Sequence, residues 1–343
     1  MPGPIRPGEE LPLDRLENYL RRQLPELSGT FSVRQFHGGH ANLTYKLTFG
    51  DRELVLRRPP FGTIAPGAHD MRREYRILSR LPTYFAPAPR AHLLCTDHEV
   101  IGADFVVMER RHGTVVRYAL PDTFRTMPRV EERLTDALMR VTANLHRVDV
   151  EVAGLLELGN PEGFALRQLT GWSKRWQLAK TEENADMDRL ADRLARDIPA
   201  PQRVSIVHGD LKFDNCQFSA GDPDTVTAVF DWDMATLGDP LIDLAGTLSF
   251  WPDPALDAAD MPVRLLDGDW PDKDYLKERY ATHTRLSLDR MPWYEAFACF
   301  KTAVIAQQLY RRYVRGSTRD ARMEKFGRAA RAFAALGRTK LGQ

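Results

Sequence analysis

An aspartate and an asparagine five residues apart lie in the segment VHGDLKFDNCQF, residues 207–218. The apolar run before them, residues 204–207, predicts a strand, which places Asp210 and Asn215 on one short loop at its end. A second apolar run, TAVF, ends at another carboxylate, Asp231. Any one of these residues alone could cap a turn. As an ordered set they fit phosphoryl transfer, with Asp210 as the catalytic base that accepts the proton of an attacking hydroxyl, and Asn215 and Asp231 as ligands of Mg²⁺.

The segments around this set predict two kinds of structure. The first 111 residues contain a helical stripe from about His69 to Leu81 and five stretches of strand-forming residues: TFSVRQF, LTYKLTF, ELVLRR, AHLLCT and DFVVMER. Beyond Gly113, apolar residues recur at helical spacing, as at Leu134 and Leu138. We therefore expect an α+β protein of two lobes: an antiparallel sheet with one helix in residues 1–111, and a larger, mostly helical lobe in residues 112–343.

Composition narrows the class of protein. The 343 residues include 48 basic and 47 acidic side chains, so the net charge is +1 and gives no indication of a nucleic-acid or membrane partner. The three cysteines are scattered and lack the paired spacing of a zinc site or a disulfide framework. The first residues, MPGPIRPGEELP, contain no apolar targeting segment, so we expect a cytoplasmic protein.

Three motifs carry a family resemblance: HGDLKFDN at 208–215, VFDWD at 229–233 and GDPLIDLA at 238–245. In order and spacing they resemble the aminoglycoside phosphotransferase and choline kinase group of protein-kinase-like enzymes. With GGHANLTY, LRRPP, REYRIL and WYEAFACFKTAVI, the chain is similar from about residue 30 to 330 to the subfamily that includes domains fused to acyl-CoA dehydrogenases. The resemblance implies a bilobal protein-kinase-like fold whose first lobe binds ATP or GTP and whose second lobe carries catalysis and acceptor binding.

The resemblance also implies roles for residues near the catalytic loop. It gives Asp210, Asn215 and Asp231 the roles already inferred, with Mg²⁺ as the metal. His208 would brace the loop, and Asp243 would anchor it from a following helix through backbone amides. The role of Asp233 is left open: it could contact the metal, or it could cap the segment that follows.

A phosphate-binding turn is expected upstream. Gly38 and Gly39, followed by Asn42, lie in FHGGHANLTY between two predicted strands, where backbone N–H groups can approach phosphate oxygens. A Gly-Gly pair is also typical of an ordinary hairpin. On the next strand Arg57 replaces the usual lysine, with Glu74 as its helical partner; Arg can bridge phosphate and carboxylate bidentately. The alternative is that both are solvated surface charges.

The segment FVVMERR resembles the connection between the lobes of the family. This resemblance implies that Met108 lines the adenine pocket and that the backbone of Glu109 and Arg111 hydrogen-bonds to adenine.

The acceptor is the least determined part of the prediction. Seven aspartates between Trp251 and Tyr275 could attract a polycation such as an aminoglycoside, or could form a solvated loop. Trp251, Trp293 and Tyr294 could form apolar walls for an acyl or ring-bearing acceptor, or could pack between helices. We expect a small-molecule kinase that phosphorylates a metabolite hydroxyl, such as that of a hydroxyacyl-CoA, with a functional link to acyl-CoA dehydrogenases. The alternatives are an aminoglycoside phosphotransferase and a non-catalytic nucleotide-binding pseudokinase.

Overall fold

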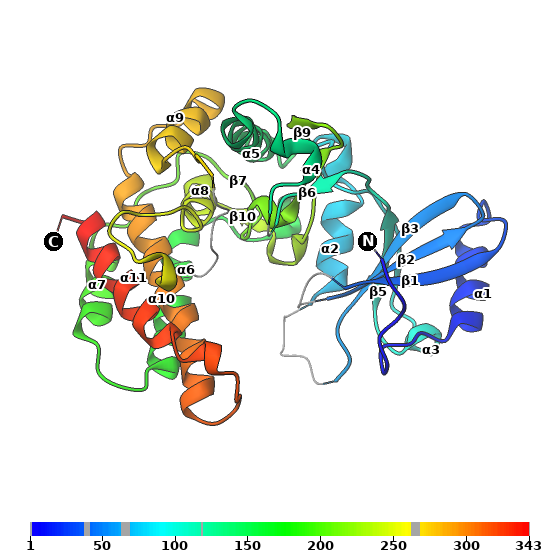
Figure 1. Cartoon of the computed structure of the whole chain (residues 1–343), viewed down its shortest axis with the longest axis horizontal. Helices are drawn as coiled ribbons and strands as arrows, with labels where there is room; N and C mark the ends of the chain where they lie inside the picture. The colour runs from blue at the N-terminus through cyan, green and yellow to red at the C-terminus, as the bar shows by residue number, and fades with distance from the viewer. Residues whose placement is uncertain (1, 38–41, 63–68, 118, 262–267, 343) are drawn as a thin grey trace. The chain divides into compact units, whose positions relative to one another are not determined.

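The computed structural model describes residues 2–37, 42–62, 69–117, 119–261 and 268–342, and the chain forms two compact units (Figure 1). The first unit consists of Met1–Gly113, Val150–Leu158 and Thr227–Ala235. The second consists of Thr114–Asp149, Gly159–Val226 and Thr236–Gln343. A unit built on an antiparallel sheet and a mainly helical unit together give the α+β fold that the sequence predicts.

The first unit is a five-stranded antiparallel sheet in the order β1-β2-β3-β5-β4, and all five predicted strand segments are confirmed. Its elements are α1 (Leu13–Gln23), β1 (Phe31–Phe36), β2 (Leu43–Phe49), β3 (Arg52–Arg58), α2 (Met71–Leu78), η1 (Leu81–Thr83), β4 (Ala91–Cys95), α3 (His98–Ile101), β5 (Phe105–Glu109), η2 (Leu156–Leu158) and η4 (Trp232–Met234).

Side chains of this sheet alternate between two faces, one that packs into the core and one that carries Arg57. Leu54 and Leu56 of β3 pack into one core with residues of α1 and α3. The residues between and after them, Val55 and Arg57, therefore lie on the opposite face, the one that α2 contacts through β4 and β5 (Figure 1). Met108 of β5 is the register partner of Val55, so it shares this face with Arg57.

The second unit is mostly helical. Its elements are β6 (Thr114–Val115), α4 (Asp122–Arg125), α5 (Val130–His146), α6 (Phe164–Ala179), α7 (Ala185–Arg196), β7 (Ser205–Val207), η3 (Phe213–Asn215), β8 (Cys216–Ser219), β9 (Asp222–Val229), which continues into the first unit, β10 (Thr236–Gly238), α8 (Pro240–Leu248), η5 (Ala258–Asp260), α9 (Lys273–Thr284), α10 (Met291–Val314), η6 (Ala321–Met323) and α11 (Phe326–Lys340).

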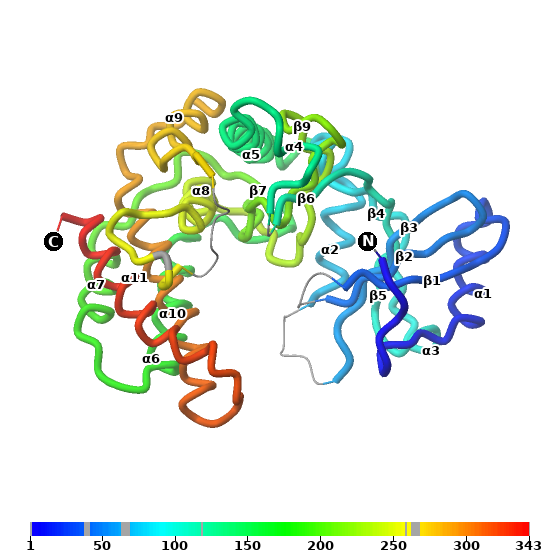
Figure 2. The backbone as a smooth tube through the Cα atoms, viewed as in Figure 1, coloured from blue at the N-terminus to red at the C-terminus, as the bar shows by residue number. Residues whose placement is uncertain are grey.

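The long helix α10 organises the second unit. It packs along α11, the two running side by side in orange and red (Figure 2), and it also contacts α6, α7 and α8. Helix α5 packs on α9 and on β7, the strand that leads into the predicted catalytic loop. Among the described helices, none is long and apolar enough to cross a membrane.

Candidate active site

Arg57 is the centre of a buried charge cluster in the first unit. Its Nη1 lies 2.7 Å from Glu74 Oε1, and its Nη2 lies 3.0 Å from Asp231 Oδ1. The Glu74 side chain is fully buried and that of Arg57 is 11% exposed, so the two are not solvated surface charges. Three segments distant in sequence thus place three of the predicted site residues together.

The cluster holds more negative than positive charge. Asp233 is close enough to add to the field of Asp231, so three carboxylates surround one guanidinium. Burial raises the pKa of Glu74 to about 7, and the nearby Arg57 offsets this only in part. Burial and the neighbouring Asp231 likewise raise the pKa of Asp233. Among the described residues, no group of three or more acidic, histidine or cysteine side chains is arranged to hold a metal ion by itself, so the excess charge of this cluster is not a complete metal site.

The turn after β9 fixes the position of Asp231. Asp231 adopts a left-handed backbone conformation, with φ 69° and ψ 63°, which aspartate tolerates better than most residues. The next residue, Trp232, is buried, and its indole N–H donates to the carbonyl oxygen of Val229 at 2.8 Å. The buried indole therefore anchors a turn whose carboxylate stays 34% exposed.

Of the residues predicted for the phosphate-binding turn, the structure describes only Asn42. Gly38 and Gly39 lie outside the described residues. Asn42 is buried, and its Oδ1 lies 2.8 Å from His69 Nδ1. Its Nδ2 is buried with no hydrogen-bond partner among the residues the structure describes.

The predicted adenine contacts follow strand β5. Met108 is buried on the Arg57 face of the sheet. The backbone N–H of Glu109 already donates to the carbonyl oxygen of Arg90 at 2.9 Å. The Arg111 guanidinium donates to the carbonyl oxygens of Ala86 and Ala88 and pairs with Glu109. The adenine-binding roles of these residues stay predictions.

The predicted catalytic loop of the second unit is held by a fully buried carboxylate. Asp243 of α8 accepts hydrogen bonds from the backbone N–H groups of His208 (2.7 Å) and Gly209 (2.8 Å). His146 Nε2 lies 3.2 Å from the same carboxylate, and its Nδ1 lies 2.7 Å from the Tyr280 hydroxyl. Burial alone would raise the pKa of Asp243, but His146 and the His208 N–H outweigh it and lower that pKa.

His146 and Tyr280 are the members of this network that the sequence did not suggest. His146 ends α5 four residues after Thr142 and eight after Leu138, so it continues a buried helical stripe as a polar residue. That interruption is a signal for a buried partner. No comparable signal exists for Tyr280, whose hydroxyl meets His146 across 134 positions of the chain.

Asp210 and Asn215 face each other within the loop. The Asn215 Nδ2 donates to the backbone carbonyl of Asp210 at 2.7 Å and to its Oδ2 at 3.1 Å. Lys212 pairs with the same carboxylate, whose side chain remains 29% exposed. Among the described residues no donor contacts Asn215 Oδ1, so the amide is oriented with its oxygen available to a hard cation.

His208 lies beneath this loop. It is fully buried, and its Nδ1 accepts a hydrogen bond from the backbone N–H of Asp210 at 3.3 Å. The imidazole therefore supports the backbone that carries Asp210, while the backbone N–H of His208 donates to Asp243.

The aspartate-rich run does not assemble into one acidic surface. Asp253 pairs with Lys273 and Lys340, and both Asp257 and Asp260 pair with Arg328. Asp272 caps α9 and Asp274 pairs with Lys277, whereas Asp267 lies outside the described residues. Basic side chains within or next to the run and others from α11 thus pair with most of its described aspartates.

The three aromatic residues considered as acceptor walls are buried packing residues. Trp251 lies against Phe213 of the predicted catalytic loop, with ring centroids 5.4 Å apart. The Trp293 indole donates to the carbonyl oxygen of Leu194, and the Tyr294 hydroxyl donates to Asp239 at 2.6 Å. These contacts stabilise helices and the loop rather than line an open site.

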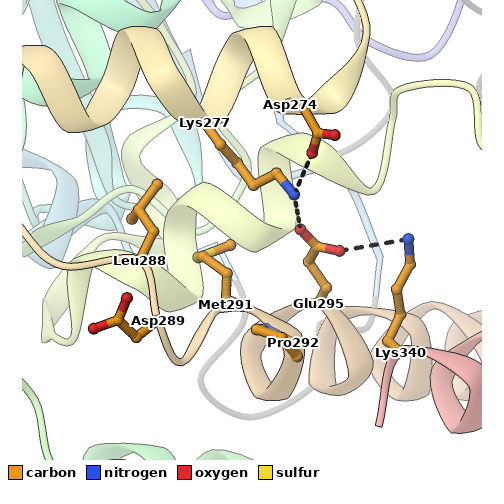
Figure 3. A pocket seen from close by; sticks show the side chains of 8 residues that line it. All are labelled: Asp274, Lys277, Leu288, Asp289, Met291, Pro292, Glu295 and Lys340. Carbon is orange, nitrogen blue, oxygen red and sulfur yellow. Dashed lines mark ion pairs between the residues drawn. The ribbon is translucent and has the colours of Figure 1, made fainter. Parts of the chain in front are cut away.

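A cavity of about 410 Å³ lies elsewhere in the second unit (Figure 3). Four of its charged side chains form ion pairs: Lys277 pairs with Asp274 and Glu295, and Lys340 pairs with Glu295 (Figure 3). None of the residues predicted for the active site lines it.

Residues 32–278 match the model of the phosphotransferase enzyme family. The chain belongs to this family. A candidate aminoglycoside phosphotransferase from Ralstonia eutropha JMP134 is similar in structure, with 31% identity, a TM-score of 0.79, and coverage of 96% of this chain and 98% of that one. At 18% identity, a mutant of aminoglycoside phosphotransferase APH(4)-Ia in complex with ADP and hygromycin B shares the fold, with a TM-score of 0.58 over 94% of this chain and 98% of its own.

Curated relatives include longer proteins and a small-molecule kinase. Mouse acyl-CoA dehydrogenase family member 10 is 33% identical over 97% of this chain, and chicken family member 11 is 31% identical over 94%. The chain spans only 31% and 42% of their lengths. Thiamine kinase of Escherichia coli is 27% identical over 71% of this chain and 73% of its own. The resemblance inferred from the motifs is thus confirmed.

Proposed function

We propose that the protein is a small-molecule kinase that transfers the γ-phosphoryl group of ATP or GTP to a hydroxyl group. Membership of the phosphotransferase family supports the reaction class. The observation that carries the proposal is the loop on which Asn215 is oriented by Asp210, leaving one amide oxygen free beside a partly exposed carboxylate.

Asp210 is the proposed base. It would align the acceptor hydroxyl and take its proton as the oxygen attacks phosphorus. Hydrogen bonds to the loop backbone fix its position: Asp243 accepts from the N–H groups of His208 and Gly209, and the His208 ring accepts from the N–H of Asp210. Lys212 pairs with Asp210 and so orients that carboxylate.

Asn215 and Asp231 are the proposed ligands of Mg²⁺, which would neutralise the charge of the nucleotide phosphates. Arg57, held by Glu74, would contact the phosphates in place of the usual lysine. Its planar guanidinium can bind phosphate with one edge while it remains paired with a carboxylate.

For the acceptor we favour a hydroxyacyl-type metabolite. The similarity to acyl-CoA dehydrogenase family members 10 and 11 supports this choice, and with it a functional link to acyl-CoA dehydrogenases. The dispersal of the acidic run argues against a polycationic aminoglycoside, which needs several carboxylates converging on one site.

The experiment is a Mg²⁺-ATP and Mg²⁺-GTP phosphorylation screen with mass-spectrometric detection. Acceptors are hydroxyacyl-CoA thioesters, kanamycin, choline-like amines, thiamine and sugars. We expect a phosphorylated hydroxyacyl product that disappears with Asp210→Asn and persists with Asp192→Asn, a change at an exposed position of α7. Phosphorylation of kanamycin alone would overturn the assignment of a hydroxyacyl acceptor. Nucleotide binding without phosphoryl transfer to any acceptor would indicate a pseudokinase.

The metal site has its own test. Asp231→Ala should abolish the Mg²⁺-dependent part of nucleotide affinity, measured by calorimetry with Mg²⁺ and with EDTA. Affinity in EDTA should change little, because only the metal-mediated contact is lost. Asp233→Ala is the matched control that decides whether the second carboxylate also serves the metal. Equal Mg²⁺-ATP affinity in Asp231→Ala and the parent protein would contradict the assignment.

A further inference from the structure

Two cations of the second unit share one aromatic ring. The guanidinium carbon of Arg175, on α6, lies 4.3 Å from the ring centroid of Trp172. The Lys301 ammonium, on α10, lies 5.6 Å from the same centroid. Helices α6 and α10 pack together, so the arrangement is part of the fold of this unit. Cation–π attraction to an indole holds each charge but does not neutralise it.

Neither cation has a carboxylate of its own. Within the described part of the chain, no ion pair is formed by Arg175 or Lys301. The carboxylates whose charges reach Lys301 are Asp243 and Asp210. Asp243 is already bound by two backbone N–H groups and His146, and Asp210 by Lys212 and Asn215.

The surroundings of Lys301 disfavour its charge. Burial lowers its pKa, and Arg175 and Lys212 lower it further, while Asp243 and Asp210 act in the opposite direction. Lys301 is thus within electrostatic reach of two other cations, Arg175 and Lys212, whose repulsion an anionic ligand would offset. Asp210, the proposed base, pairs with Lys212 and also acts on Lys301.

We propose that Lys301 and Arg175 form an anion-binding subsite that selects acceptors carrying a carboxylate or phosphate group in addition to the reacting hydroxyl. The inference rests on the proposed kinase function and narrows its substrate class. An anionic acceptor would be drawn toward Asp210 by the three cations, and its charge would offset theirs. A polycationic aminoglycoside would meet the same cations as repulsion, which reinforces the preference drawn from the dispersed acidic run.

The test measures binding rather than turnover, so it is independent of whether transfer is observed. Ligand-detected NMR without nucleotide compares 6-hydroxyhexanoate, its uncharged methyl ester, and 3-hydroxyhexanoyl-CoA. The variants are Lys301→Met, which keeps an unbranched chain over Trp172, and Arg175→Met, at an exposed position. Lys174→Met, exposed on the same helix, is the matched control, and Lys301→Arg tests rescue.

We expect an anionic probe to bind better than the ester, and its affinity to fall on the order of tenfold in Lys301→Met and less in Arg175→Met. Lys301→Arg should restore most of the affinity, and Lys174→Met should not change it. Preference for the free acid identifies a carboxylate subsite, and binding of the thioester alone identifies a phosphate subsite.

The proposal is overturned if acid and ester both bind with equal measurable affinity, if neither anionic probe binds, or if both Met variants at the ring match the parent. It is also overturned if Lys301→Met lowers Mg²⁺-ATP affinity while leaving the anionic probe unaffected. Arg175→Met keeps the test decisive if Lys301→Met impairs folding. A negative phosphorylation screen would refute the kinase function while leaving these binding results to stand on their own.

Discussion

Two fully buried carboxylates, one in each unit, have opposite pKa shifts. Glu74 has a pKa raised to about 7, while the pKa of Asp243 is lowered. Glu74 lies 2.7 Å from a guanidinium, but Asp231 shares that cation and adds negative charge. Asp243 instead receives two backbone N–H groups and an imidazole contact. Dedicated hydrogen-bond donors therefore stabilise a buried anion where a shared counter-ion does not.

The difference indicates that the two carboxylates have different roles. Asp243 is satisfied by protein groups alone, as expected for a residue that sets the position of the catalytic loop. The Arg57 cluster carries excess negative charge in the protein alone, as expected where metal and nucleotide complete the charge balance.

The largest expected effect is on the Asp243 network. Asp243→Asn turns an acceptor toward three donor groups into a partial donor, so we expect the free energy of unfolding to fall by about 3 kcal/mol or more. Urea denaturation measures it. Asp289→Asn, at an exposed position, should change stability by less than about 0.5 kcal/mol. A loss for Asp243→Asn as small as that of the control would show that the network is dispensable.

The next effect is the pH dependence of the Arg57 cluster. Because the folded-state pKa of Glu74 lies above its ordinary value of 4.5, the folded protein retains a proton that the unfolded chain releases between pH 4.5 and about 7. The free energy of unfolding should therefore fall as pH rises through this window, by up to about 3 kcal/mol from this residue. Glu74→Gln cannot titrate and should flatten the curve measured by urea denaturation from pH 5 to 8. A parent protein that gains stability relative to Glu74→Gln as pH rises would show that the guanidinium dominates.

The smallest effect is at the edge of the Asp243 network. Tyr280→Phe removes the hydroxyl that contacts His146 but keeps the ring, so we expect a loss of about 1 kcal/mol in unfolding free energy. Tyr84→Phe, at a position 47% exposed, is the control and should be near neutral. Equal stability of the two variants would show that the Tyr280 hydroxyl contributes nothing to the free energy of unfolding, and that within this network only Asp243 and His146 do.

Local sequence patterns predicted the first unit well. Each of its five strands coincides with a stretch of strand-forming residues, because alternation of buried and exposed positions is encoded residue by residue. The helix expected from about His69 to Leu81 is shorter, Met71–Leu78, because the Asp70 side chain accepts hydrogen bonds from the N–H groups of Arg72 and Arg73 and so starts the helix later.

Contacts between segments distant in sequence could be predicted only where a known motif links the segments. Asp231 was found because it belongs to a spaced set, although only the fold shows it 3.0 Å from Arg57. Tyr280 belongs to no such set, Lys301 lies in the motif WYEAFACFKTAVI but had no role assigned to it, and the partners of both lie on other helices. The acidic run shows the converse: composition indicated a charged surface, whereas two of the cations that neutralise it, Arg328 and Lys340, come from the distant helix α11.

The central claim is that Asp210 is the base of a phosphoryl transfer. The measurement is steady-state turnover of the acceptor found in the screen, together with calorimetric Mg²⁺-ATP affinity, for the parent and Asp210→Asn. The account predicts that kcat falls by on the order of 10² or more while nucleotide affinity stays nearly unchanged. Turnover of Asp210→Asn close to the parental rate would contradict it.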